Sequence, residues 1–280
     1  MDRQLFGIFG DPVGHSLSPA MQNAAFKALG LPHYYVPFLV RSEQLKDALH
    51  AIRVLGLAGV NVTIPHKEAV IPFLDEMDEE ARRIGAVNTI QRDGNRLLGY
   101  NTDGRGFIQS LLENGVDPSG KRVILLGGGG AARGVAYALL AAHAAELLIL
   151  TRSPHTGSAL AERLTTFFPK AAIFSGKMGM ATLPSSRPTL LINATPLGMK
   201  EGDPIPYATE QIQPEWIVSD LIYRPDETPL LMEAKKRGAR IVPGMGMLLH
   251  QGGLAFEIWM RKPAPVSAMR QALEAALQRS

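Results

Sequence analysis

The chain has 280 residues, of which 46% are apolar and 20% are charged, a composition typical of a globular protein with ample core. Its formal net charge is only +3 and its Lys and Arg residues do not cluster, so nucleic acid is not an expected partner. There is no cysteine, which excludes disulfides, thiolate metal sites and cysteine nucleophiles and agrees with a reducing compartment.

The N-terminal segment has the composition of a folded domain rather than of a signal peptide, because Gly7 and Gly10 interrupt its apolar residues. The most apolar stretch, residues 135–150, contains His143 and Glu146 and is too short to span a bilayer. We therefore expect a cytoplasmic protein that does not bind membranes.

The first hundred residues predict a small α/β unit. Apolar and alternating segments indicate strands at 5–9, 34–38 and 59–64, and a hairpin of 86–92 and 96–101 around Asp93-Gly94. Helices are expected in four places: after Ser18 as N-cap, after Ser42, from Pro65-His66-Lys67, and in the acidic segment 75–84. A further helix follows Asp103 and ends at Gly115.

The stretch 123–135 begins as an apolar strand, breaks into Gly127-Gly128-Gly129-Gly130, and resumes as an Ala-rich helix. From Gly127 the spacing is Gly-x-Gly-x-x-Ala, an accepted variant of the dinucleotide-binding fingerprint. Glycine permits the tight turn and lets the backbone approach a pyrophosphate, which the N–H groups of the helix N-terminus can bind. On its own, the same spacing also fits a glycine-rich turn in any strand–helix unit.

The remaining chain alternates strands and helices. Strands are predicted at 123–126, 147–151, 171–174, 189–193, 217–221 and 240–242, with helices at 131–142, 158–168 and 228–237. This alternation predicts a doubly wound parallel sheet and supports the dinucleotide site. Two final helices, 248–260 and 266–277, are expected to pack back on the first domain. We predict a substrate domain of residues 1–102 plus 244–280, a dinucleotide domain of residues 103–243, and a cleft between them.

The end of the second strand of such a sheet normally faces the adenosine ribose, where a carboxylate selects NAD and a basic residue accommodates the 2′-phosphate of NADP. Here that strand ends in Thr151-Arg152-Ser153, and no Asp or Glu follows until Glu162. Arg152 can pair with a phosphate and stack on adenine, so NADP is favoured. An ordinary surface arginine is the alternative for Arg152 alone.

Hydride transfer at a carbinol carbon needs a group that handles the proton on oxygen. Lys67 is a candidate, since a cation in the first turn of a helix opposes the helix dipole and loses its proton more readily. Asp103 could supply a partner charge, although a helix cap explains it equally well. The seven histidines show no ligand spacing, so no metal is expected, and no nucleophile elbow supports a Ser–His–Asp triad.

Several motifs together resemble the shikimate dehydrogenase family, in the family's order from Phe6 to Trp259. They are His15-Ser16-Leu17-Ser18-Pro19, Asn61-Val62-Thr63-Ile64-Pro65-His66-Lys67, Gly85-Ala86-Val87-Asn88-Thr89, Gly99-Tyr100-Asn101-Thr102-Asp103-Gly104, the glycine loop, Asn193-Ala194-Thr195-Pro196-Leu197-Gly198-Met199, and Gly244-Met245-Gly246-Met247-Leu248-Leu249-His250-Gln251.

The resemblance implies NADP-linked, reversible reduction of 3-dehydroshikimate to shikimate, with Lys67 as general acid–base beside Asp103. It implies that Ser16 and Ser18 bind the substrate carboxylate. The residues that it places at the substrate hydroxyls or ring are Thr63, Asn88, Asp103, Tyr223 and Gln251. For the cofactor it implies that the pyrophosphate is held by Gly127, Gly128, Gly129, Gly130 and Ala131. It implies that Arg152 binds the 2′-phosphate and that Leu221 and Gly244 lie beside the nicotinamide.

Two departures from the family's pattern bear on the cofactor. A second basic residue often follows the position of Arg152, whereas Pro154-His155-Thr156 supplies only a histidine. Leu221 stands where methionine is common, a nearly isosteric change. The alternatives are a quinate/shikimate dehydrogenase with relaxed cofactor use and a non-catalytic NADP-binding regulatory protein. The sequence leaves open a monomer or a homodimer.

Overall fold

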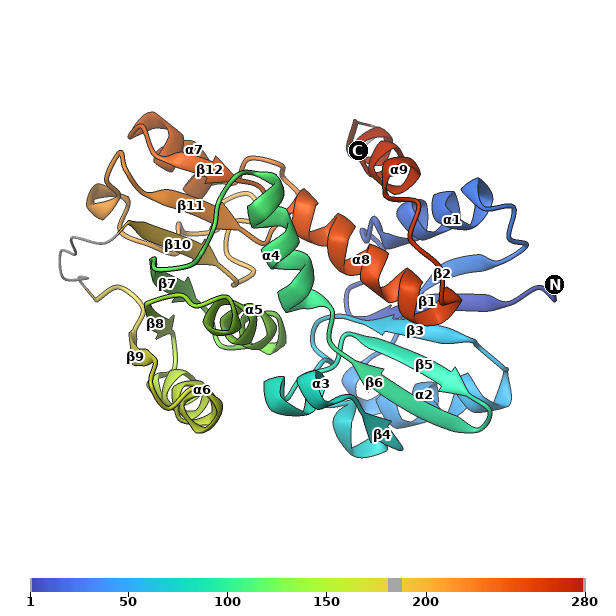
Figure 1. The fold of residues 1–280 in the computed structure, drawn as a ribbon. Helices are drawn as coiled ribbons and strands as arrows, with labels where there is room; N and C mark the ends of the chain where they lie inside the picture. The colour runs from blue at the N-terminus through green and yellow to red at the C-terminus, as the bar shows by residue number, and fades with distance from the viewer. Residues whose placement is uncertain (1, 181–187, 279–280) are drawn as a thin grey trace. The chain divides into compact units, whose positions relative to one another are not determined.

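A computed structural model describes residues 2–180 and 188–278. The chain divides into two compact units, Met1–Gly106 with Leu248–Ser280, and Phe107–Met247 (Figure 1). Both boundaries fall within helices, α4 (Asp103–Glu113) and α8 (Met245–Met260). Within the described ranges, no helix combines the length and apolar character that a membrane crossing requires.

The first unit contains one mixed sheet with the strand order β2-β1-β3-β5-β6-β4. Its strands are β1 (Leu5–Gly10), β2 (Tyr34–Leu39), β3 (Gly59–Val62), β4 (Glu76–Met77), β5 (Thr89–Asp93) and β6 (Arg96–Tyr100). β1 is parallel to β2 and β3, whereas β5 is antiparallel to β3 and β6. The pairing of Asp93 with Arg96 confirms the predicted hairpin.

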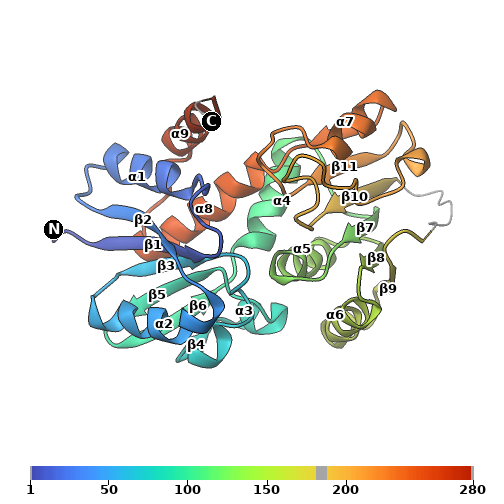
Figure 2. The same ribbon diagram turned by 180° about the vertical axis from the view of Figure 1, so that it is seen from behind.

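Helices cover both faces of this sheet (Figures 1 and 2). The remaining α-helices of the unit are α1 (Ser18–Ala28), α2 (Leu45–Val54), α3 (Glu79–Ile84) and α9 (Val266–Gln278). On one face, Leu49 and Ile52 of α2 pack into a buried apolar cluster with Val60 of β3. On the other face, the ring centroids of Phe6 and Phe26 lie 5.2 Å apart, and the rings of Phe256 and Trp259 join the same aromatic group. The C-terminal helices therefore pack on the first unit, as predicted.

The second unit contains six parallel strands in the order β12-β11-β10-β7-β8-β9. They are β7 (Arg122–Leu126), β8 (Glu146–Thr151), β9 (Ala172–Lys177), β10 (Thr189–Asn193), β11 (Ile217–Asp220) and β12 (Arg240–Val242). The connecting helices are α5 (Gly130–Ala141), α6 (Pro154–Phe167) and α7 (Pro229–Lys236). The order 3-2-1-4-5-6, counted from β7, is that of a dinucleotide-binding fold and confirms the predicted fold class.

The alternation of side chains along the strands explains why this sheet is covered on both faces. Val123 and Leu125 belong to the apolar cluster that includes residues of α5, whereas Ile124 and Leu126 belong to the cluster that includes residues of α7. All four are fully buried, at 0% exposure. A strand with both faces buried carries a nearly continuous apolar run, which is the pattern that predicted these strands.

The starts of three helices are predicted wrongly. No α-helix begins at Pro65-His66-Lys67, where turns lead to a single 3₁₀ turn, Ile71–Phe73. The carbonyl oxygen of Lys67 accepts a 2.7 Å hydrogen bond from the Val87 amide instead of continuing a helical ladder.

The other two corrections concern helix starts. Leu17 occupies the N-cap position of α1, so Ser18 is the first helical residue. Ser42 begins a 3₁₀ turn, Ser42–Gln44, and α2 starts only at Leu45. The acidic segment around residues 75–84 is divided between β4 and the shorter α3.

Candidate active site

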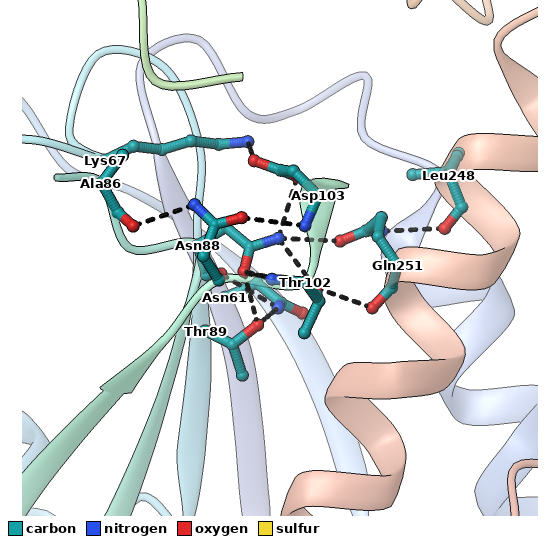
Figure 3. Close-up of polar contacts among 10 residues, drawn as sticks. Asn61, Lys67, Ala86, Asn88, Thr89, Thr102, Asp103, Leu248 and Gln251 are labelled. Carbon is teal, nitrogen blue, oxygen red and sulfur yellow. Dashed lines mark hydrogen bonds and ion pairs between the residues drawn. The ribbon is translucent and has the colours of Figure 1, made fainter. Parts of the chain in front are cut away.

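An ion pair joins two residues that sequence analysis selected separately. Lys67 lies in the turn after β3 and Asp103 is the first residue of α4, and their Nζ and Oδ2 atoms are 2.6 Å apart (Figure 3). The side chains are 13% and 4% exposed. Removing one partner would leave the other as a poorly solvated, unpaired charge, so loss of either side chain should be costly. Lys67 retains the accessible edge from which it can exchange a proton.

The helix-dipole argument for Lys67 does not apply, because no helix begins there. The turn is instead tied to the rest of the unit by its backbone and by a buried histidine. The His66 ring nitrogen Nε2 lies 2.6 Å from the carbonyl oxygen of Val40, and the Lys67 carbonyl accepts from Val87. The carboxylate of Asp103 is the charge in direct contact with the Lys67 ammonium.

Two asparagines hold Asp103 in place. The amide nitrogen Nδ2 of Asn88 donates to Asp103 Oδ1 at 2.9 Å, and the backbone N–H of Asp103 donates to Oδ1 of Asn101 at 3.0 Å. Asn101 Nδ2 donates in turn to the carbonyl of Ala86 at 2.9 Å. Both asparagines are buried, at 2% and 0% exposure. The carboxylate is therefore fixed through both its backbone and its side chain.

Gln251 enters this cluster from α8. Its Oε1 atom lies 3.3 Å from Asn88 Nδ2, and its own Nε2 donates to the carbonyl of Leu248 at 2.8 Å (Figure 3). The first unit is made of an N-terminal and a C-terminal segment of the chain, and Thr102 connects them by donating from Oγ1 to the backbone carbonyl of Gln251 at 3.0 Å. The structure thus brings together Lys67, Asn88, Asp103 and Gln251, which lie far apart in the sequence.

The other predicted substrate residues of the first unit lie at chain turns. Ser16 precedes α1, and its Oγ accepts a 3.3 Å hydrogen bond from the backbone N–H of Ser18. No side chain caps α1 from Leu17, and Pro19, the second residue of the helix, has no backbone N–H. Thr63 follows β3, and its backbone N–H donates to the Phe9 carbonyl at 2.9 Å.

Sequence reasoning missed the two threonines of this cluster. Thr89 is fully buried, and Thr102 donates its backbone N–H to Asn88 Oδ1 at 2.9 Å. A weak signal existed in the sequence, because each threonine follows an asparagine, Asn88 or Asn101, near an end of a predicted hairpin strand. Polar groups that are buried in such positions need hydrogen-bond partners.

The glycine loop of the second unit connects β7 to α5. Gly127 has φ +111°, and a Cβ there would lie 3.0 Å from the carbonyl oxygen of Ala194, so only glycine fits without strain. Gly129 is the N-cap of α5 and has no atom within 4 Å of the place a Cβ would take. Ala131 follows Gly130 in the first turn of α5, which no side chain caps. This open backbone fits a pyrophosphate.

Arg152 follows the last residue of β8 and is exposed to solvent. Thr151 Oγ1 donates to the Ser153 carbonyl at 2.7 Å, which shapes the turn into α6. A Cβ added to Gly128 would lie 2.9 Å from Thr156 Cγ2, so residue 156 adjoins the glycine loop. Residue 156 is an uncharged threonine. Arg152 is therefore the Lys or Arg residue that residues 151–156 offer to a phosphate.

Leu221 and Gly244 are neighbours in the second unit. The backbone N–H of Leu221 donates to the carbonyl of Asn193 at 2.9 Å, and a Cβ on Gly244 would lie 2.6 Å from the Leu221 carbonyl oxygen. The close approach of the two backbones requires glycine at position 244. Tyr223 lies two residues beyond Leu221 and is half-buried. It belongs to the second unit, whereas Lys67 and the other predicted substrate residues belong to the first.

A buried carboxylate, which sequence analysis did not select, anchors this segment. Asp220 is 0% exposed and accepts hydrogen bonds from Asn193 Nδ2 at 3.0 and 3.1 Å, from Thr228 Oγ1 at 2.8 Å and from the Ile222 amide at 3.0 Å. Burial raises the pKa of Asp220 from 3.8 to about 6 despite these bonds. The contacts fix both ends of the segment that contains Leu221 and Tyr223.

Within residues 2–180 and 188–278, no three His, Asp or Glu side chains are arranged to hold a metal ion. The residues present fit a dinucleotide instead: an open glycine loop at the N-terminus of α5, and a cation after the second strand of the sheet.

Two family models match parts of the chain. A family model described as the shikimate dehydrogenase substrate binding domain matches residues 8–90, and one described as the shikimate 5'-dehydrogenase C-terminal domain matches residues 244–274. A protein of Geobacter metallireducens named shikimate dehydrogenase (NADP(+)) is 45% identical over 286 residues, covering 99% of this chain and 98% of the relative.

Solved structures give the same result. A shikimate dehydrogenase in complex with NADP+ has a TM-score of 0.91 and 38% identity, covering 98% of this chain and 96% of its own. A quinate dehydrogenase from Corynebacterium glutamicum in complex with NAD has a TM-score of 0.89 and 30% identity, covering 98% of this chain and 100% of its own. The chain therefore belongs to the shikimate dehydrogenase family, as the resemblance of its motifs indicated.

Proposed function

We propose that this protein catalyses the reversible, NADPH-dependent reduction of 3-dehydroshikimate to shikimate, a step of aromatic amino acid biosynthesis. The observation that carries the proposal is the Lys67–Asp103 ion pair, 2.6 Å long and held by Asn88, in a chain of this family. A relative that had lost catalysis while keeping its fold would have no need to retain a half-buried lysine at a buried carboxylate.

Lys67 is the proton donor of the reduction. Bound NADPH supplies a hydride to the carbonyl carbon, and the carbonyl oxygen then needs one proton to become the product hydroxyl. The Lys67 ammonium gives that proton, and in the reverse direction the neutral amine takes it back. Asp103 holds Nζ in one position through the 2.6 Å contact with Oδ2.

Several polar side chains bind the substrate in this proposal. Ser16 and Ser18 bind its carboxylate at the uncapped N-terminus of α1. The residues that bind its hydroxyls or ring are Thr63, Asn88, Asp103, Tyr223 and Gln251. We assign the substrate to a domain of residues 1–102 plus 244–280 and the dinucleotide to residues 103–243.

The cofactor site consists of three parts. Residues Gly127 to Ala131 would hold the pyrophosphate, Arg152 would pair with the 2′-phosphate, and the backbones of Leu221 and Gly244 would contact the nicotinamide. The absence of Asp and Glu between Arg152 and Glu162 favours NADP over NAD. The uncharged Thr156 beside Gly128 is the feature that would weaken this preference.

A second candidate function is a quinate/shikimate dehydrogenase with relaxed cofactor use. It is favoured by the 30% identity to the quinate dehydrogenase in complex with NAD. We place the enzyme in the cytoplasm as a monomer or homodimer; cell fractionation and sedimentation of the purified chain test these two points.

The proposal is tested by initial rates of NADPH oxidation with 3-dehydroshikimate, compared with 3-dehydroquinate as the matched substrate and NADH as the matched cofactor. We expect kcat/KM for 3-dehydroshikimate with NADPH to exceed the other combinations by at least about 10-fold. Comparable rates on both substrates would establish the second candidate. No turnover with either substrate or cofactor would refute catalysis and leave a binding protein.

A further inference from the structure

A chain of buried polar side chains leads to Asn88, which donates to Asp103; Figure 3 shows its members Asn61, Thr89 and Asn88. The hydroxyl of Tyr35 donates to Asn61 Oδ1 at 2.7 Å, and Asn61 Nδ2 donates to Thr89 Oγ1 at 3.0 Å. Thr89 Oγ1 donates in turn to Asn88 Oδ1 at 3.0 Å. The exposure of these four side chains ranges from 0% to 5%. None of Tyr35, Asn61 and Thr89 has a role in the proposed reaction.

Backbone groups determine the direction of every bond in this chain. The backbone carbonyl oxygen of Asn88 can only accept a hydrogen bond. It lies 3.1 Å from Asn61 Nδ2, so the amide nitrogen of Asn61, and not its oxygen, must face it. The same nitrogen donates to Thr89 Oγ1. The single hydroxyl proton of Thr89 therefore points to Asn88 Oδ1.

The orientation of Asn88 decides what Asp103 can bind. With Oδ1 occupied by the Thr89 hydroxyl and the Thr102 amide, Asn88 directs its NH₂ group to the opposite side. That group has two protons and three acceptors: Thr102 Oγ1 and Asp103 Oδ1, both at 2.9 Å, and Gln251 Oε1 at 3.3 Å. The two protons of this NH₂ group make the two shorter bonds, to Asp103 Oδ1 and Thr102 Oγ1. The Oε1 atom of Gln251 is therefore left to accept from another donor.

We propose that Thr89 and Asn61 are positioning residues for the Lys67–Asp103 pair, acting together with the Thr102 amide to fix the side-chain orientation of Asn88. Asp103 Oδ1 has Asn88 as its side-chain donor, and Oδ2 binds Lys67. If Asn88 rotates, the carboxylate loses that restraint and the Nζ atom of Lys67 moves with it. A displacement of about 1 Å at a reacting group can lower a rate by about 100-fold. This inference rests on the proposed function.

Thr89→Val is the decisive variant because it preserves shape and removes one hydroxyl. Asn61 Nδ2 keeps the Asn88 carbonyl, and Asn88 Oδ1 keeps the Thr102 amide, so no buried group loses all its partners. Thr89→Ser restores the hydroxyl without the methyl group. Thr189→Val, at the 1% exposed first residue of β10, controls for exchanging a buried strand hydroxyl for a methyl group.

The first measurement is steady-state kinetics. We expect Thr89→Val to lower kcat by about 10-fold with KM for NADPH unchanged within about two-fold, and to alter the pH dependence of kcat. Thr89→Ser and Thr189→Val should retain kcat within about two-fold. A Thr89→Val enzyme with wild-type kcat and pH profile overturns the inference while leaving the proposed function intact.

The second measurement does not depend on activity. In protein labelled with ¹⁵N-asparagine, the side-chain amide signal of Asn88 is identified by its loss in Asn88→Asp. We expect its protons to exchange with solvent at least about 10-fold faster in Thr89→Val than in wild type, and at the wild-type rate in Thr89→Ser. Unchanged exchange in Thr89→Val overturns the inference, even if the wild-type chain proves to act on a different substrate.

Discussion

Asp220→Asn should change how the stability of the second unit depends on pH. Asp220 is fully buried, and burial raises its pKa from 3.8 to about 6. A carboxyl whose pKa is higher in the folded chain binds its proton more tightly there. It therefore stabilises the fold below about pH 4, and that contribution is lost as the pH rises through about 6. Asparagine does not titrate and removes this dependence.

The magnitude follows from the difference between the two pKa values. A change from 3.8 to about 6 corresponds to about 3 kcal/mol over the whole range. Between about pH 5 and about pH 7.5, the linkage relation predicts that the contribution of Asp220 to the free energy of unfolding falls by about 1.4 kcal/mol. The introduced amide would also place an NH₂ group against the side chain of Asn193, so only the pH dependence of the difference is predicted.

The assay is urea unfolding of wild type and Asp220→Asn at these two pH values. The chain has two tryptophans, of which Trp216 lies in the second unit beside Leu230 and Leu231. In a Trp259→Phe background, fluorescence reports that unit alone. We expect the stability of wild type relative to Asp220→Asn to fall by about 1.4 kcal/mol from about pH 5 to about pH 7.5. An equal difference at both values would refute the raised pKa and the burial argument behind it.

Two further substitutions test the cofactor site. Gly127→Ala forces a non-glycine residue to φ +111° and a Cβ to within 3.0 Å of the Ala194 carbonyl oxygen. It should cost about 1–3 kcal/mol in urea unfolding and weaken NADPH binding at least about 10-fold in a fluorescence titration, whereas wild-type affinity would show that the turn tolerates a side chain. Arg152→Gln should raise KM for NADPH by about 10- to 100-fold and leave KM for NADH within about two-fold, since only NADPH carries the 2′-phosphate. A parallel rise for both cofactors would mean that Arg152 contacts something else.

The second unit was predictable from sequence because its strands are buried on both faces. Runs such as 122–126 are apolar throughout after the first residue, and the strand–helix alternation leaves few topologies for such a sheet. The glycine loop was equally predictable, since Gly127 needs a conformation that other residues adopt only with strain. Local chemistry determines both features.

The environment of Lys67 was not predictable from local pattern. Pro65 followed by polar residues is typical of a helix start, but the Lys67 carbonyl is bound by Val87, which is distant in the sequence. The same holds for the support of Asp103, whose side chain binds Lys67 from the turn after β3 and Asn88, the residue before β5. Asp220 escaped selection because a strand-end aspartate resembles a turn residue until its burial is known.

The central claim is that Lys67 transfers the proton when NADPH reduces 3-dehydroshikimate. It is tested most directly by the turnover number of Lys67→Ala at saturating substrate, with NADPH affinity measured on the same sample. We predict a kcat lowered by about 100- to 10,000-fold and an NADPH affinity within about two-fold of wild type. A kcat within a few-fold of wild type would contradict the account.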